Sequence, residues 1–111
     1  MKDLPASFDI VSLHLFDSTM NISDADLLAW LNEINATIEE IGYPGAGYKF
    51  WKAMDETVIQ NRYMILSSWP GEEEYKLIHD HEAYKAVQEK YSELGEKITT
   101  QSLYVRYELV E

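Results

Sequence analysis

The chain has 111 residues, of which 46% are hydrophobic, and its formal net charge is −11 from 20 acidic and 9 basic residues. An acidic surface repels the phosphates of nucleic acids and of anionic membranes, so we expect neither as a partner. The absence of cysteine excludes disulfides, thiolate metal sites and thiol nucleophiles. No apolar run approaches the roughly 20 residues of a membrane span or resembles a secretory signal, and we therefore expect a cytoplasmic protein.

The first predicted element is a β-strand over residues 8–16, whose alternate residues form two different faces. One face is uniformly apolar and consists of Val11, Leu13 and Leu15. The other is mixed and consists of Ile10, Ser12, His14 and Phe16. We expect the apolar face to lie under helices.

A helix is predicted next, with Ser23 as its N-cap and Gly42 as its left-handed C-terminal stop. Apolar residues recur at helical spacing along one side, namely Leu27, Leu28, Leu31, Ile34, Ile38 and Ile41.

Residues 48–54 and 62–69 read as two further strands, joined by a hairpin connection over residues 55–61. A second helical region follows, and its stripe changes phase, which predicts a break near residues 79–81 with Asp80 as the N-cap of one longer second segment. Residues 102–110 form the last strand, with Leu103, Val105, Tyr107 and Leu109 on one face and Tyr104, Arg106 and Glu108 on the other.

The element order strand, helix, strand, strand, helix, strand predicts an α+β, ferredoxin-like βαββαβ domain over residues 1–111. Its four-stranded antiparallel sheet would carry both helices on one face. The mixed face is too apolar for water and too polar for an ordinary core, so we expect a second protomer to cover it. A homodimer through this sheet face would enclose a cavity lined by polar groups.

The chain resembles the dimeric α/β barrel superfamily, in particular its antibiotic biosynthesis monooxygenase-like branch. The resemblance rests on the element order, on residues 62–69 (RYMILSSW), on the Glu-rich turn after them and on the broken helix before Tyr84. It implies paired sheets from two protomers and chemistry on a small apolar or aromatic ligand without a cofactor. The superfamily also includes haem-degrading enzymes, lactone isomerases, haem peroxidases and proteins with no assigned reaction.

Two positions depart from the resemblance. Ile78 stands where many monooxygenase-like members have His, and His79 is its neighbour, about 100° away around a helix. Gln88 stands where haem-degrading members carry their ligand His, so haem degradation of that type is not expected here.

Seven residues are candidates for a functional site. The catalytic candidates are His14 and His79, and the substrate-binding candidates are Ser12, Trp51, Trp69, Tyr104 and Arg106. His14 is a general base or a buried structural His, and Arg106 binds an anionic group or forms an ion pair with Glu108. The two Trp residues are walls of a ligand site or anchors of a core or an interface. His79 and His81 do not share a helical face, so no metal site is expected.

The function that these features favour is a cofactor-independent, monooxygenase-like enzyme in which a base deprotonates an electron-rich substrate inside a dry pocket. The alternative is a non-catalytic ligand-binding or interaction module of the same fold. A pocket filled by the protein's own aromatic side chains would favour that alternative.

Overall fold

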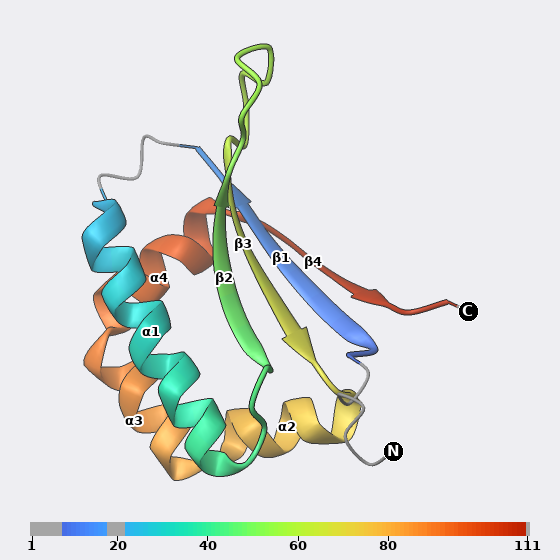
Figure 1. Ribbon diagram of the computed structural model, residues 1–111. Coiled ribbons are helices and arrows are strands. Elements are labelled where there is room, and N and C mark those ends of the chain that lie inside the picture. The colour runs from blue at the N-terminus through green and yellow to red at the C-terminus, as the bar shows by residue number, and fades with distance from the viewer. Residues whose placement is uncertain (1–7, 18–21, 111) are drawn as a thin grey trace.

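The computed structural model describes residues 8–17 and 22–110, and it has the ferredoxin-like fold that the element order predicts (Figure 1). The strands and helices are β1 (Ile10–Phe16), α1 (Asp24–Ile41), β2 (Gly47–Lys52), β3 (Tyr63–Trp69), α2 (Glu72–Asp80), α3 (Glu82–Lys90), α4 (Ser92–Gln101) and β4 (Leu103–Glu108). The sheet is antiparallel with strand order β2-β3-β1-β4, and the helices cover one of its faces. No helix in the described residues is both long enough and apolar enough to cross a membrane.

Helix α1 begins and ends where its capping residues predict. The Ser23 hydroxyl accepts a hydrogen bond from the Asp26 backbone N–H at 3.1 Å, which satisfies one free donor of the first turn. Gly42 ends the helix with φ at +124°, and its N–H donates to the carbonyls of Ile38 and Glu39. Both capping predictions are confirmed.

The second helical region breaks twice, and the predicted cap at Asp80 is wrong. Asp80 is the last residue of α2, and the extended residue His81 caps α3 by accepting the Ala83 N–H at its ring Nδ1. The second break falls at Tyr91, where one continuous helix was predicted. The Tyr91 hydroxyl donates to Glu33 of α1 at 2.9 Å, and this contact helps to hold the corner from which α4 turns back over the sheet.

The two faces of the sheet are the reverse of the prediction. Ile10, Ser12 and Phe16 are buried under the helices, whereas Val11 and Leu13 lie on the open face and are partly exposed. The reversal extends to the neighbouring strands. Ser12 is paired with Ser67 of β3 and with Arg106 of β4, and residues paired across strands lie on the same face of the sheet. Periodicity shows that a strand has an apolar face, but it does not distinguish a face that helices cover from a face that a partner covers.

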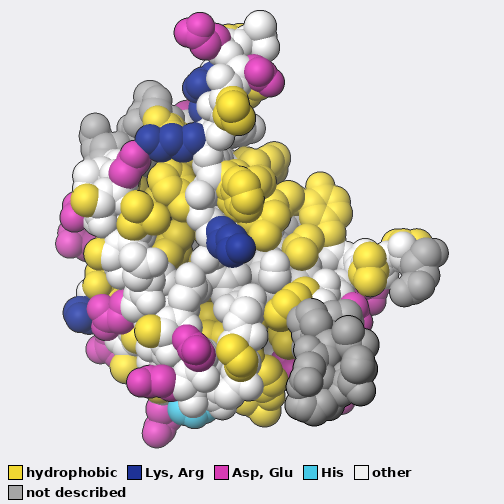
Figure 2. All heavy atoms as spheres, viewed as in Figure 1, with side chains coloured by type: hydrophobic (Ala, Val, Ile, Leu, Met, Phe, Trp, Pro, Cys, Tyr) yellow, Lys and Arg dark blue, Asp and Glu magenta, His cyan; other side chains and the backbone are white. Residues whose placement is uncertain are grey.

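The open face of the sheet is largely apolar. Hydrophobic side chains gather over the strands below the projecting β2–β3 hairpin (Figure 2). From strand register, the apolar residues of this face are Val11, Leu13, Leu15, Trp51, Met64, Leu66, Leu103, Val105 and Tyr107. A partner on the sheet would therefore meet these residues. The prediction that it would cover the mixed face, which includes Ser12 and His14, is wrong because the helices cover that face.

Candidate active site

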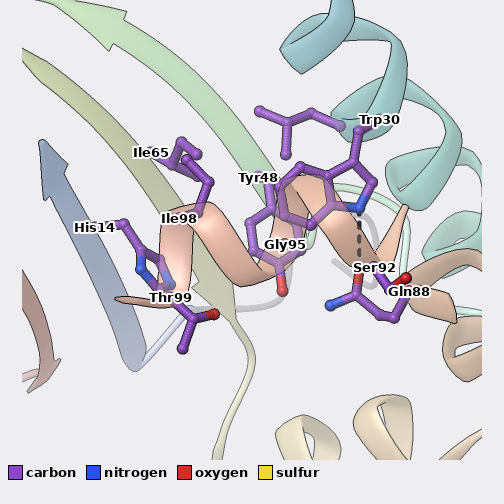
Figure 3. Close-up of a pocket in the computed structure, with 10 residues that line it drawn as sticks. His14, Trp30, Tyr48, Ile65, Gln88, Ser92, Gly95, Ile98 and Thr99 are labelled. Atoms are coloured by element: carbon purple, nitrogen blue, oxygen red, sulfur yellow. Dashed lines mark hydrogen bonds between the residues drawn. The ribbon is translucent and has the colours of Figure 1, made fainter. Parts of the chain in front are cut away.

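A cavity of about 260 Å³ lies between the covered face of the sheet and helices α1, α3 and α4 (Figure 3). This volume is just below the roughly 300–1,000 Å³ typical of ligand sites, so it suits a small compound. Its lining residues are His14, Trp30, Leu31, Tyr48, Ile65, Gln88, Ser92, Gly95, Ile98 and Thr99. The lining thus combines apolar walls with a few polar groups, as ligand sites commonly do.

His14 of β1 brings a titratable nitrogen to this cavity. Its Nδ1 lies 3.0 Å from the Ser102 hydroxyl, and that hydroxyl donates its own proton to the Ile98 carbonyl. Ser102 must therefore accept from His14, which places the imidazole proton on Nδ1 and leaves Nε2 as the basic nitrogen. No described residue forms a hydrogen bond with Nε2. Burial lowers the pKa of His14, so the ring is neutral near pH 7.

A chain of hydrogen bonds runs along the opposite wall of the cavity. Trp30 Nε1 donates to Gln88 Oε1 at 3.0 Å, and Gln88 Nε2 donates to the Tyr84 hydroxyl at 3.3 Å. The Tyr84 hydroxyl lies 2.6 Å from the Tyr48 hydroxyl. Burial raises the pKa of both tyrosines, which keeps them protonated at neutral pH.

His79 lies beyond this wall, among aromatic rings and outside the lining of the cavity. Its ring stacks on Tyr75 at 3.9 Å between centroids and contacts Trp69 and Tyr84 at 4.9 and 4.7 Å. Its Nδ1 donates to the Tyr75 carbonyl at 2.7 Å, which again leaves Nε2 as the basic nitrogen. Burial lowers the pKa of His79, although the hydrogen bond to Tyr75 opposes this shift.

Ser12 and Trp69 belong to a buried polar cluster of the sheet. Trp69 is fully buried, and its Nε1 donates to the hydroxyls of Ser67 at 3.1 Å and Ser12 at 3.4 Å. The two serine hydroxyls also hydrogen-bond to each other. The cluster is satisfied within itself, and neither predicted residue lines the cavity.

The other three predicted residues lie in different places. Arg106 donates to Glu72 of α2 at 2.6 Å, and its guanidinium lies 4.5 Å from the ring centroid of Tyr75. Its ion-pair partner is therefore Glu72 and not the predicted Glu108. The ring of Tyr104 packs against His14 at 4.6 Å, while Trp51 lies on the open face and is 49% exposed.

The structure thus assembles a site that only partly overlaps the predicted one. Of the seven candidates, only His14 lines the cavity, and Tyr104 packs against the His14 ring. The sequence reasoning missed Trp30, Tyr48, Gln88 and Ser102. The spacing of Tyr84 and Gln88, four residues apart on one helical face, was a usable signal, whereas the approach of Tyr48 depends on tertiary structure. Within the described residues, no group of three His, Asp or Glu side chains converges to hold a metal ion.

No protein-family model matches this sequence, and no curated protein matches it either.

Solved structures with the same fold do match. A dimeric ferredoxin-like protein of unknown function from Thermobifida fusca has a TM-score of 0.56 and 13% identity, over 96% of each chain. A DABB family protein with a ferredoxin-like fold from Mesorhizobium loti has a TM-score of 0.56 and 10% identity, over 95% of this chain and 100% of that one. A variant of SnoaB, a cofactor-independent oxygenase from Streptomyces nogalater, has a TM-score of 0.50 and 10% identity, over 92% and 89%. At such identities the similarity shows the fold alone.

Proposed function

We propose that the protein is a cofactor-independent oxygenase that acts on a small, electron-rich aromatic substrate held beside His14. The observation that carries the proposal is the state of the His14 ring. Ser102 holds the Nδ1 proton, burial keeps the ring neutral, and the free Nε2 belongs to a side chain of the cavity lining. A neutral imidazole next to a ligand-sized space is suited to act as a general base.

The chemistry needs only this base, a dry pocket and molecular oxygen. Nε2 removes the hydroxyl proton of a phenol, and the resulting phenolate donates electrons to O₂ so that a carbon–oxygen bond forms. The O–O bond then breaks, one oxygen atom stays on the ring and the other leaves as water. Phenol and O₂ thus give quinone and water, and the substrate supplies all the electrons that reduce O₂.

The cavity walls would support this reaction by excluding water. Trp30, Leu31, Ile65 and Ile98 are each no more than 7% exposed and present apolar surface to the cavity. An apolar wall binds an aromatic ring through burial of its surface, and it strengthens the electrostatic effect of each polar group nearby. SnoaB, which shares the fold, is described as a cofactor-independent oxygenase, and this description adds support.

The test is oxygen consumption with a panel of phenols, naphthols and hydroxyanthrones. We expect the wild-type protein to oxidise at least one of them and His14→Asn to lose about a hundredfold or more of the rate, the usual contribution of a general base. His81→Asn is the matched control, because His81 is an exposed helix cap and Asn caps helices well. Equal rates in the wild type and His14→Asn would contradict the proposal.

A non-catalytic ligand-binding module is the second candidate. It is favoured by the space under α2, which the rings of Trp69, Tyr75, His79 and Tyr84 fill. The ion pair between Arg106 and Glu72 also favours this candidate, because it occupies the guanidinium group. If the wild-type protein binds members of the phenol panel but consumes no oxygen with any of them, this candidate replaces the first.

We also propose that the protein forms a homodimer through the open face of the sheet. Three of its large side chains, Trp51, Leu103 and Tyr107, are 49%, 59% and 53% exposed in the single chain. A contiguous apolar face of this kind is costly in water, and a second copy of the same face would cover it symmetrically. The Thermobifida fusca protein of the same fold is described as dimeric.

A further inference from the structure

The direction of the hydrogen bonds along the cavity wall follows from one donor. The indole N–H of Trp30 can only donate, so the Gln88 atom 3.0 Å away must be its carbonyl oxygen. The amide of Gln88 is thereby oriented, and its NH₂ group donates to the Tyr84 hydroxyl at 3.3 Å. Tyr84 therefore receives a hydrogen bond and must place its own proton elsewhere.

The only hydrogen-bond acceptor available to that proton within the described residues is the Tyr48 hydroxyl, 2.6 Å away. Tyr84 is 3% exposed, and a buried hydroxyl proton without a partner costs about 1–3 kcal/mol. If Tyr84 donates to Tyr48, the Tyr48 proton is left over, and Tyr48 lines the cavity where a ligand can accept it. If Tyr48 donated instead, the Tyr84 proton would be buried and unpaired.

The backbone holds Tyr48 in place for this role. β2 is an edge strand, and the Asn35 side chain of α1 pairs with the outward backbone groups of Tyr48. Asn35 Oδ1 accepts the Tyr48 N–H and Asn35 Nδ2 donates to the Tyr48 carbonyl, both at 2.8 Å. A side chain fixed by its backbone and by a hydrogen-bond chain is preorganised, which is what a recognition group requires.

We infer that Tyr48 donates a hydrogen bond to an oxygen atom of the ligand, and that Trp30, Gln88 and Tyr84 position its proton. The ligand class is an aromatic compound that carries a phenolic or carbonyl oxygen. The inference deepens the proposed function and rests on it for the substrate's reaction with His14. Binding of the ligand at Tyr48 does not depend on turnover. When His14 removes a proton, negative charge grows on the substrate oxygen, and a preformed donor there stabilises it.

The test uses two probes of similar shape, 1-naphthol and 1-methylnaphthalene, which differ in a hydroxyl group. Affinities are measured by fluorescence titration under nitrogen, so that no oxidation takes place. We expect the wild-type protein to prefer 1-naphthol, and Tyr48→Phe to weaken 1-naphthol by about tenfold with little effect on 1-methylnaphthalene. Tyr91→Phe removes a hydroxyl outside the cavity lining and is the matched control.

Two further variants test the positioning residues through the same preference. Trp30→Phe frees the Gln88 amide to turn, and Tyr84→Phe removes the hydroxyl that donates to Tyr48. Each should reduce the preference for 1-naphthol, which a loss of packing alone would not do because both probes would then weaken together. Wild-type protein that shows no preference for 1-naphthol, or Tyr48→Phe that weakens both probes equally, would overturn the inference. Loss of oxygen consumption in His14→Asn is a separate readout, so failure of the proposed function is distinguishable.

Discussion

The covered face of the sheet carries buried polar side chains, whereas the open face presents apolar ones to solvent. Ser12, Ser67 and His14 lie under the helices, each with a hydrogen-bond partner. From strand register, Lys49 and Ser68 are the only polar side chains of the strands on the open face. An isolated globular protein arranges its sheet the other way. Burying a polar group costs free energy unless the group forms a hydrogen bond inside the protein. An exposed apolar face of this size is typical of a surface that another molecule covers.

The difference between the two faces bears on the two proposals made above. Buried polar groups that are fully paired orient the groups around them, as Ser102 orients His14 and as Gln88 orients Tyr84. The apolar face offers no such group, and its residues differ little from one another in chemistry. This contrast supports the two proposals made above, that the covered face binds the ligand and that the open face is the contact between two protomers.

Placing a charge at the centre of the open face should have the largest effect. Leu13 lies on β1, between its neighbours Leu66 and Val105. In a symmetric dimer Leu13→Asp buries a carboxylate from each protomer, so we expect the dissociation constant to rise by about a thousandfold or more. Sedimentation equilibrium over a range of concentrations measures this change.

Leu77→Asp is the matched control for this prediction. Leu77 is 50% exposed on α2, away from the open face, so the same substitution there should leave the dissociation constant unchanged. A wild-type protein that is monomeric at every concentration would contradict the association proposed for the open face, as would a Leu13→Asp variant that dimerises normally.

Two neighbouring serines, Ser67 on the covered face and Ser68 on the open face, allow the two faces to be compared through the same substitution to Ala. Ser67 is 1% exposed and accepts from Trp69, so Ser67→Ala should lower the free energy of unfolding by about 1–3 kcal/mol. Ser68 lies on the open face, and its hydroxyl forms no hydrogen bond with the described residues, so Ser68→Ala should change the free energy of unfolding by under about 0.5 kcal/mol. Urea unfolding measures both, and equal losses would mean that the two faces are energetically alike.

The buried imidazoles make stability depend on pH. Burial lowers the pKa of His14 and His79 from the ordinary 6.5, so the unfolded chain takes up protons at a higher pH than the folded chain. Protons therefore favour the unfolded state, and the free energy of unfolding should fall as the pH drops below about 6.5. Urea titrations between pH 7.5 and 5 should show a shallower fall for His14→Asn and His79→Gln. An unchanged pH dependence in both variants would be inconsistent with neutral buried rings.

The smallest effect is expected at the edge of the covered face. Arg106 and Glu72 form an ion pair whose side chains are 35% and 50% exposed, and exposed pairs contribute little. Arg106→Gln should lower the free energy of unfolding by under about 1 kcal/mol, with the difference shrinking in high salt. A loss of several kcal/mol would show that this pair belongs to the buried network.

Local signals predicted the fold well because they depend on neighbours in the chain. Ser23 and Gly42 bound α1 through their own hydrogen bonds and dihedral angles, and the order of elements follows from such signals. The break at His81 was placed within one residue, but its cap was assigned to Asp80, because the sequence does not show that an imidazole can accept the Ala83 N–H.

The faces and the site were harder to predict because they depend on pairing between distant segments. The strand of Val11 and Leu13 has an apolar face whichever partner covers it, so the assignment to helices was reversed. The matching of Ser12 with Ser67 across β1 and β3 was a signal for the correct face, but reading it requires the register first. Likewise, Ser102 is 88 positions from His14, and no local pattern joins them.

The protonation state of His14 tests the central claim most directly, and nitrogen-15 NMR of the histidine side chains measures it across pH. We predict that at pH 7 the His14 ring is neutral with its proton on Nδ1, and that its pKa lies below the ordinary 6.5. A ring that carries its proton on Nε2 at pH 7, or one that is charged there, has no basic nitrogen free for a substrate and would contradict the claim.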